Sequence, residues 1–534
     1  MNKIPVIDLF AGPGGLAEGF STLNEKGKRL FDIRLSIEKD ENAYKTLLLR
    51  SFCRQFPLNK LPEEYYDVIK ANSVLERDNL IIKLYEKYKK EALLAKEEAW
   101  HCELGSDRFP EKLIDDKIEK QLEGSSEWVL IGGPPCQAYS LVGRSRVGGI
   151  DPKDHRVYLY KEYLRIIAKH HPSVFVMENV KGLLSAKVND EKVFDMIKND
   201  LENPSKVFPN FTSTKYKIYS LSTSVDFFDE NSNPIYKDNR DYLIKSEDYG
   251  IPQNRHRVIL LGIRDDIYIK PEILEKNDNY NTVYDVISSL PKIRSGLSKS
   301  YTGYDWITKD GKKKKKRKYQ KIDNTNENWI NIYTDHLREF SSWSEIDIKK
   351  SLIEKTLNTG GEYVKCDISI DRNHSLFKWY IDKKLDGVPN HESRTHLKQD
   401  LKRYLFSALY TKKYGIFPKM RDYEKHDSEL LPDHDSATSG KFADRFRVQL
   451  PYSPATTVTS HISKDGHYFI HYDESQCRSF TVREAARIQT FPDNYVFCGS
   501  RTAQYHQVGN AVPPLLAYQI AQIVNNVINQ LNIK

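Results

Sequence analysis

One cysteine stands where a predicted strand ends in a stiff loop. The segment from 128 to 140 reads WVLIGGPPCQAYS, in which a short apolar run is followed by two glycines, two prolines and Cys136. The apolar run predicts a buried strand that stops abruptly at the glycines. Because proline restricts φ, the loop loses little entropy when it holds the thiol in one place, which suits a nucleophile. An inert buried cysteine is the alternative.

A glycine-rich segment near the start of the chain could hold a nucleotide. IPVIDLF at 4–10 predicts a strand, and AGPGGLAEGF follows it directly. Glycines allow the backbone to approach a ligand, and the helix expected next offers unpaired N–H groups. A second strand at 33–37 ends at Glu38, where an acid commonly binds ribose hydroxyls. A purely structural turn and an NAD site are alternatives.

Polar residues also mark two later strands. One strand runs into the sequence ENV at 178–180, and another begins after QNRHR at 253–257. Ligands of open α/β sheets bind at the carboxyl edge, so Glu178 is a candidate acid, with a helix cap as the plainer alternative. We expect one of Arg255 and Arg257 to face the site and the other to support the loop below it.

Length and composition limit the class of protein. The chain has 534 residues, 39% of them hydrophobic, and a net charge of +8. These values predict a large domain with smaller lobes and are compatible with a polyanionic partner. The six cysteines include no CxxC pair, so neither a zinc site nor a disulfide framework is indicated. Without a signal peptide or a membrane-spanning run, an intracellular protein with reduced thiols is expected.

The composition divides the chain into three parts. We expect a mostly parallel α/β sheet with helices on both faces, built from residues 1–264 and completed by residues 446–534. A charged helical insertion is expected at about 42–124. Residues 265–445 are rich in Lys, Asn, Tyr and Trp and should form a separate lobe.

Three shorter segments carry expectations of their own. The run KKKKKRK at 312–318 suits phosphate contact, with a disordered solvated loop as an equal alternative. The segment 456–473 predicts a hairpin that turns at 464–466. Residues 142–154 are rich in glycine and arginine and predict a mobile loop.

Taken in their order along the chain, several short segments of the sequence resemble the DNA (cytosine-5)-methyltransferases of the bacterial type. The matching sequences are DLFAGPGG, the acid Glu38, GGPPCQAYS, ENV, QNRHR, REAARIQTFPD and QVGNAVPP. They cover roughly the first 260 residues, with interruptions, and about the last 90. The resemblance implies a Rossmann-like, S-adenosylmethionine-dependent methyltransferase fold with a separate target-recognition lobe at 265–445.

The resemblance also implies the role of each catalytic residue. Cys136 matches the nucleophile that adds to C6 of cytosine and so activates C5. Glu178 matches the acid at N3 of the base, and Arg257 matches the arginine at O2. Arg255 and Asn179 match residues that support the Pro-Cys loop. Such chemistry requires that the cytosine be flipped out of the duplex.

S-adenosylmethionine is the methyl donor that the resemblance implies. The residues expected to contact it are Phe10, Ala11, Gly12, Gly14, Gly15, Glu38, Pro134, Asn510 and Ala511. Gln137, Ser140 and Arg144 are candidate DNA contacts in the loop that would close over the flipped base. The acid that contacts adenine in the family is hard to place, and Asn72 is the candidate.

The main hypothesis is an enzyme that methylates C5 of cytosine in a short double-stranded DNA sequence, in restriction–modification or phage defence. RNA, such as tRNA, is the alternative substrate. A DNA-binding protein without turnover and an NAD-dependent enzyme are further rivals, which the intact set of catalytic residues disfavours. We expect a monomer in the bacterial cytoplasm, at the nucleoid, with restriction or defence proteins as candidate partners and no metal or membrane.

Overall fold

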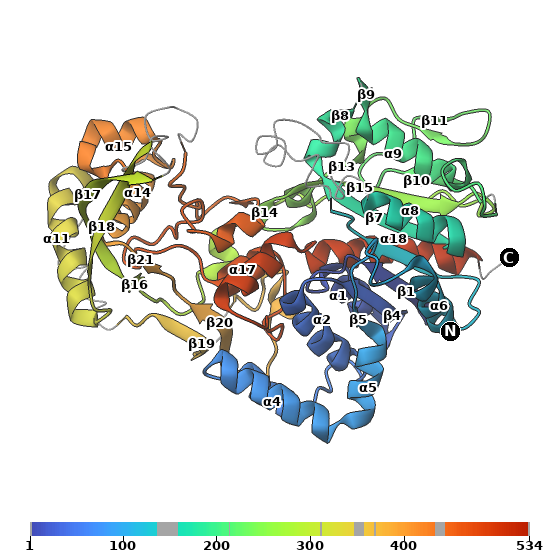
Figure 1. The fold of residues 1–534 in the computed structure, drawn as a ribbon, viewed down its shortest axis with the longest axis horizontal. Helices are drawn as coiled ribbons and strands as arrows, with labels where there is room; N and C mark the ends of the chain where they lie inside the picture. The colour runs from blue at the N-terminus through green and yellow to red at the C-terminus, as the bar shows by residue number, and fades with distance from the viewer. Residues whose placement is uncertain are drawn as a thin grey trace.

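The structure is a computed structural model that describes residues 3–135, 159–188, 190–212, 214–309, 312–345, 357–367, 370–432 and 444–531. A body built on a large sheet lies at one end of the long axis, and a lobe formed by described residues of 295–344 and 395–432 lies at the other (Figure 1). Within the described ranges, no helix has the length and apolar character needed to cross a membrane.

The body contains an eight-stranded sheet in the order β10-β15-β7-β6-β1-β4-β5, with β13 paired to β15. Its strands are β1 (Ile4–Leu9), β4 (Phe31–Glu38), β5 (Ala99–His101), β6 (Val129–Gly132), β7 (Val174–Val180), β10 (Tyr216–Tyr219), β13 (Leu243–Lys245) and β15 (His256–Arg264). The strands from β7 to β5 run parallel, and β15 runs antiparallel to β7. The predicted α/β sheet is therefore confirmed.

Helices cover both faces of the sheet because side chains alternate along each strand. Ile7 and Leu9 of β1 join one apolar core with residues of three helices, α6 (Glu111–Leu122), α8 (Leu159–His170) and α9 (Val193–Glu202). Val6 joins the opposite core with α1 (Gly15–Thr22) and α18 (Pro514–Leu531). The last helix of the chain thus covers the first strand.

The region expected to be a helical insertion also contributes to the sheet. Its helices are α2 (Glu41–Arg54), α3 (Glu63–Ile69), α4 (Val74–Lys87), α5 (Lys89–Glu98) and α6. Strand β5 lies among them and pairs in parallel with β4. Ile114 and Ile118 of α6 are fully buried in the core of the body. The three residues of β5 are too few to carry a periodic signal, so the sequence did not predict this strand.

The prediction of a hairpin that turns at 464–466 is wrong. Residues 460–463 form a short 3₁₀ helix, η8 (Ser460–Ser463), and Ile470 makes single bridges to Val448 and Ser479. Ile462 and Phe469 are buried against α16 (Val482–Ile488) and α17 (Arg501–Asn510). The apolar spacing of this segment therefore reflects burial against helices and not the pairing of two strands.

The lobe has a core of its own. Its elements are β16 (Gly296–Leu297), β17 (Lys299–Lys309), β18 (Lys312–Lys321), α11 (Asn326–Ser344), β21 (Thr395–His396), α14 (Lys398–Tyr414) and α15 (Met420–His426). Three elements between α11 and β21 pack instead in the core around α16 and α17: β19 (Gly360–Lys365), α13 (Phe377–Tyr380) and β20 (Gly387–Glu392). Trp329 of α11 and Tyr404 of α14 are buried in this core, which also includes Phe446. The helix predicted at 397–410 is confirmed. The lysine run at 312–318 forms β18, so its interpretation as a disordered loop is wrong.

Glycines let α1 and α18 approach each other closely. A Cβ atom at Gly15 would lie 2.3 Å from the carbonyl oxygen of Val512. At Gly19 it would lie 2.5 Å from the Cβ of Ala517. Real Cβ atoms do not approach other atoms this closely, so the contact between the first and last helices of the body requires glycine at both positions.

We predict that Gly15→Ala lowers the free energy of unfolding by about 1–3 kcal/mol, because the added methyl group overpacks the α1–α18 contact. Urea unfolding followed by circular dichroism measures the change. Gly361→Ala is the control, since a Cβ there would lie 3.5 Å from the nearest atom, the carbonyl oxygen of Tyr363. Equal effects of the two substitutions would contradict the packing argument.

Candidate active site

The ends of four parallel strands meet at one edge of the sheet. β1, β4, β6 and β7 are paired in parallel, so the glycine turn, Glu38, the proline loop and Glu178 follow one another along that edge. The antiparallel strand β15 starts at the same edge, where Arg257 lies opposite Val180. Open α/β sheets bind their ligands at this edge, so the structure brings these predicted site residues to a place where a ligand site is expected.

The glycine turn after β1 is held by the acid at the end of β4. Glu38 accepts hydrogen bonds from the N–H groups of Gly12 through Oε2 (2.7 Å) and Asp40 through Oε1 (2.7 Å). The N–H of Ala11 donates to the carbonyl of Ile37 (3.0 Å). Burial raises the pKa of the Glu38 carboxyl above its ordinary value, although the two N–H donors oppose the rise.

The residues of the turn have different structural roles. Gly12 has φ of 58°, and a Cβ there would meet no described atom within 4 Å, so this side of the turn is open. Gly14, with φ of 96°, is the N-cap of α1. Gly15 packs against the carbonyl of Val512. Phe10 also has φ of 58°, a conformation that costs a residue with a side chain and that tends to occur at functional sites.

The segment before α18 reaches the glycine turn from the other end of the chain. Its Val512 carbonyl lies against Gly15. Ala511 is buried and its carbonyl accepts a hydrogen bond from Gln489 (3.3 Å). Asn510 is exposed, and its Nδ2 lies 3.2 Å from Nδ1 of His506. The structure thus brings the predicted C-terminal contacts to the side of the turn.

Glu178 and Arg257 form an ion pair at the centre of the edge. Nε of Arg257 lies 2.9 Å from Oε1 of Glu178, and the two side chains are 15% and 14% exposed. Ile259 lies opposite Glu178, so Arg257 is a diagonal neighbour on the same face. A Cβ at Gly133 would lie 3.0 Å from the other carboxylate oxygen. The acid, the guanidinium and the start of the proline loop therefore meet in one place.

Arg255 is directed away from this pair. It lies in the break between β14 (Gln253–Asn254) and β15, is buried, and donates through Nη1 to the carbonyls of Val458 (2.7 Å) and Gly509 (3.4 Å). Burial lowers the pKa of its guanidinium well below the ordinary value, and the nearby Arg257 lowers it further. Arg255 thus ties the C-terminal segment to the start of β15, and Arg257 faces the site.

Asn179 lies under the proline loop. Its Nδ2 is 3.5 Å from the carbonyl of Pro134, at the outer limit of a hydrogen bond, and its Oδ1 accepts from the N–H of Val180 (2.8 Å). The remaining site residues of the sequence analysis lie outside the described residues, and their roles stay predictions: Cys136, Gln137, Ser140 and Arg144.

The end of β5 adds residues that the sequence analysis missed. The N–H of Cys102 donates to the carbonyl of Glu38 (3.0 Å), and Glu103 forms an ion pair with Lys39 (3.2 Å). Glu103 therefore lies beside Glu38 at the carboxyl edge. Asn72 lies instead in the turn between α3 and α4. The signal for Glu103 was an acid shortly after AWH, a strand too short to recognise.

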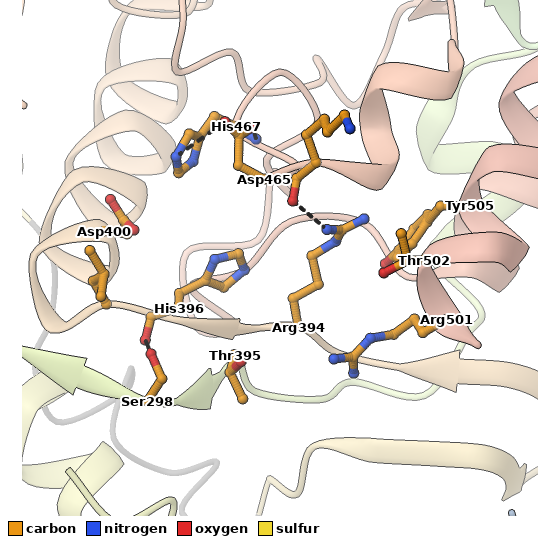
Figure 2. Close-up of a pocket in the computed structure, with 12 residues that line it drawn as sticks. Ser298, Arg394, Thr395, His396, Asp400, Asp465, His467, Arg501, Thr502 and Tyr505 are labelled. Atoms are coloured by element: carbon orange, nitrogen blue, oxygen red, sulfur yellow. Dashed lines mark hydrogen bonds and ion pairs between the residues drawn. The ribbon is translucent and has the colours of Figure 1, made fainter. Parts of the chain in front are cut away.

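A polar cavity of about 330 Å³ lies between the lobe and the start of α17 (Figure 2). Arg394 crosses from the lobe, donates hydrogen bonds to the carbonyls of residues 462–464, and lies 4.0 Å from the ring centre of Tyr505. His396 and His467 are buried on the lobe side, and burial lowers the pKa of both imidazoles. These contacts make the cavity part of the joint between lobe and body.

Comparisons with known proteins identify the family of the chain. The model of the C-5 cytosine-specific DNA methylase family matches residues 96–205 and 236–526. Type II methyltransferase M.Bpa9945I of Bacillus paralicheniformis is 32% identical over 98% of this chain and 99% of its own. DNA (cytosine-5-)-methyltransferase M.ApeKI of Aeropyrum pernix is 24% identical over 76% of this chain and 83% of its own. The chain belongs to the C-5 cytosine-specific DNA methylase family.

A solved structure supports the fold. An E. coli protein described as a DNA modification methyltransferase encoded within a prophage aligns with a TM-score of 0.51 and 19% identity, over 99% of this chain and 100% of that one. The fold is thus the Rossmann-like fold of S-adenosylmethionine-dependent methyltransferases, and S-adenosylmethionine is the methyl donor. The predicted family, fold and donor are confirmed.

Proposed function

We propose that the protein methylates C5 of cytosine in a specific double-stranded DNA sequence, as the modification enzyme of a restriction–modification or phage-defence system. The observation that carries the proposal is the Glu178–Arg257 ion pair at the sheet edge where the proline loop begins. The name of the Bacillus paralicheniformis relative, a type II methyltransferase, favours a partner restriction endonuclease.

The residues at the edge fit the methyl donor. S-adenosylmethionine supplies a methyl group bound to a positively charged sulfur. The turn is open at Gly12, and the Glu38 carboxylate keeps lone pairs for ribose hydroxyls after it accepts its two N–H groups. Glu103, which lies near Glu38, is the proposed acid for the adenine amino group. The other proposed contacts are Phe10, Ala11, Gly14, Gly15, Pro134, Asn510 and Ala511.

The pairing of an acid with an arginine suits the polar edge of cytosine. N3 and O2 lie on the same polar edge of the base, separated only by C2, and Nε of Arg257 lies 2.9 Å from Oε1 of Glu178. Negative charge develops at these two atoms when a nucleophile adds to C6. Arg257 can donate to O2, and Glu178 can donate to N3 once it has taken up a proton. The two donors then stabilise that charge, and their effect is larger in a site that excludes water.

Cys136 is the proposed nucleophile. Its Sγ forms a bond to C6, and the electron pair of the C5–C6 double bond forms the bond from C5 to the methyl carbon. The methyl–sulfur bond of the donor breaks at the same time, and its electron pair leaves with neutral S-adenosylhomocysteine. A base, such as water, then removes the C5 proton, the double bond re-forms and the thiolate leaves. Asn179 and Arg255 act as positioning residues, since Asn179 lies under Pro134 and Arg255 fixes the start of β15.

Access to C5 requires that the cytosine leave the stacked duplex. Gln137, Ser140 and Arg144 are the proposed DNA contacts of the loop that would close over the flipped base. Residues 265–445 are the proposed target-recognition region, and the catalytic domain would consist of residues 1–264 and 446–534. A protein of this kind in the bacterial cytoplasm would meet its DNA substrate directly.

We predict that the purified protein transfers labelled methyl groups from S-adenosylmethionine to unmethylated bacterial duplex DNA and not to RNA transcribed from it. Glu178→Gln should slow the transfer by about 10²–10⁴-fold, because the acid at N3 is lost. Glu123→Gln is the matched control, since Glu123 pairs with Arg34 (3.0 Å) away from the edge. Transfer to RNA alone would contradict the proposed substrate, and an unchanged rate in Glu178→Gln would contradict the proposed acid.

The affinity for S-adenosylmethionine should depend on the charge of Glu38. Its raised pKa means that the carboxylate, the form that accepts hydrogen bonds, is lost at a higher pH than for an ordinary glutamate. We therefore predict weaker binding as the pH falls from 7 toward the raised pKa, measured by calorimetry. Glu38→Gln should bind about ten- to a hundredfold more weakly at pH 7 and should lose this pH dependence. A pH dependence retained in the variant would contradict the assignment.

A further inference from the structure

The lysine run forms one strand of a two-stranded ribbon on the lobe. β17 and β18 pair antiparallel from Lys299 and Lys321 at the base to Lys309 and Lys312 at the far end. The ribbon lies beside α11 and α14, at the end of the molecule away from the large sheet (Figure 1). Every side chain from 313 to 321 is exposed, so the ribbon presents its basic strand to solvent.

The strand register sorts the side chains into two faces. Residues directly opposite each other share a face, which places Tyr304 with Arg317 and Trp306 with Lys315. Lys313 lies on this face too, and we call these five residues the aromatic face. Trp306 is 60% exposed, and Nζ of Lys315 lies 4.3 Å from the ring centre of Tyr304.

The other side of the ribbon has as many basic residues and no aromatic ring. Lys314 lies opposite Ile307, Lys316 lies opposite Asp305, and Lys318 lies opposite Gly303. We call Lys314, Lys316 and Lys318 the opposite face. Lys318 forms an ion pair with Asp305 (2.8 Å). The aromatic residues lie only on the aromatic face, and the Asp305 carboxylate lies only on the opposite face. Each named face has three basic side chains.

The ribbon concentrates positive charge on one strand. The sequences of β17 and β18 contain one acidic residue, Asp305, against basic residues at every position from 312 to 318. Lysines two apart on one face are about 7 Å from each other, within the Debye length of about 8 Å at physiological salt, so they repel. Two-stranded ribbons are also marginally stable in water. A bound polyanion would remove the repulsion and stabilise the ribbon.

We propose that the aromatic face binds the phosphate backbone of duplex DNA beside the target sequence, without reading bases. The inference rests on the proposed DNA substrate. Lys and Arg side chains neutralise phosphates, and the hydroxyl of Tyr304 and the indole N–H of Trp306 are suitable donors to phosphate oxygens. A two-stranded ribbon is narrow enough to lie along a groove of the duplex. The ribbon then adds affinity that is independent of sequence.

The test compares two triple variants of the full-length protein that remove the same charge. One carries Lys313→Gln, Lys315→Gln and Arg317→Gln, and the other carries Lys314→Gln, Lys316→Gln and Lys318→Gln. Binding to a fluorescent duplex made only of A·T pairs is measured by anisotropy at several salt concentrations. This duplex contains no cytosine, so the measurement needs neither a target sequence nor turnover.

The aromatic-face variant should lose at least about tenfold in affinity at 0.1 M salt, and its slope of log K against log salt should shrink by about two to three. The opposite-face variant should change the slope by less than about one. Equal changes in both variants, no change in either, or a loss seen only on duplexes with the target would each overturn the proposal.

Measurements of S-adenosylmethionine binding and of aggregation distinguish a loss of phosphate contacts from misfolding or aggregation of the variants. Both variants should bind S-adenosylmethionine as the unmodified protein does, which shows that the body remains folded. Aggregation of the variants with an unchanged salt slope would overturn the proposal and assign the lysines to the protection of an exposed strand edge. If the unmodified protein methylates no DNA, the proposed function fails, and the A·T-duplex measurement still decides whether the ribbon binds phosphates.

Discussion

The backbone pairing of β1 with β4 and β6, and of β6 with β7, forces the ends of these strands to a single edge of the sheet. Each strand ends in a different chemical group: a glycine turn, a carboxylate at Glu38, a proline loop and the acid Glu178. The antiparallel β15 adds Arg257, which pairs with Val180 near the start of that strand. Groups from five distant parts of the chain thus become neighbours because of this backbone pairing.

The C-terminal segment locks this edge from the other side. The Val512 carbonyl packs so closely on Gly15 that a Cβ there would lie 2.3 Å from its oxygen, so no larger residue fits. Arg255 donates a hydrogen bond to the Gly509 carbonyl (3.4 Å). Gln253, fully buried, donates to the carbonyl of Ile488 (3.2 Å). Because these contacts link the two ends of the chain, the lobe can be inserted between them without disturbing the site. The lobe is then free to present a surface separate from the site, such as the basic ribbon proposed to bind DNA.

The sequence predicted the strands and residues of the edge because buried strands read as short apolar runs between turn residues, and polar groups at their ends stand out. Glu178 and Arg257 could be named, but their ion pair required the register of β7 and β15. Strand β5 is too short to give a signal. The sequence gives no strand signal at 312–321, because lysines are poor strand formers and the strand depends on its pairing with β17. The hairpin expected at 464–466 failed because burial against helices imitates strand alternation.

The most direct test of the account is base-resolved mapping of 5-methylcytosine in cellular DNA. The cells would lack other cytosine methyltransferases and would express either the unmodified protein or Cys136→Ser. If Cys136 is the nucleophile of a DNA cytosine methyltransferase, methyl marks will appear at one short sequence motif with the unmodified protein and will be absent with the variant. Marks that persist in Cys136→Ser, or DNA without marks in both strains, would contradict it.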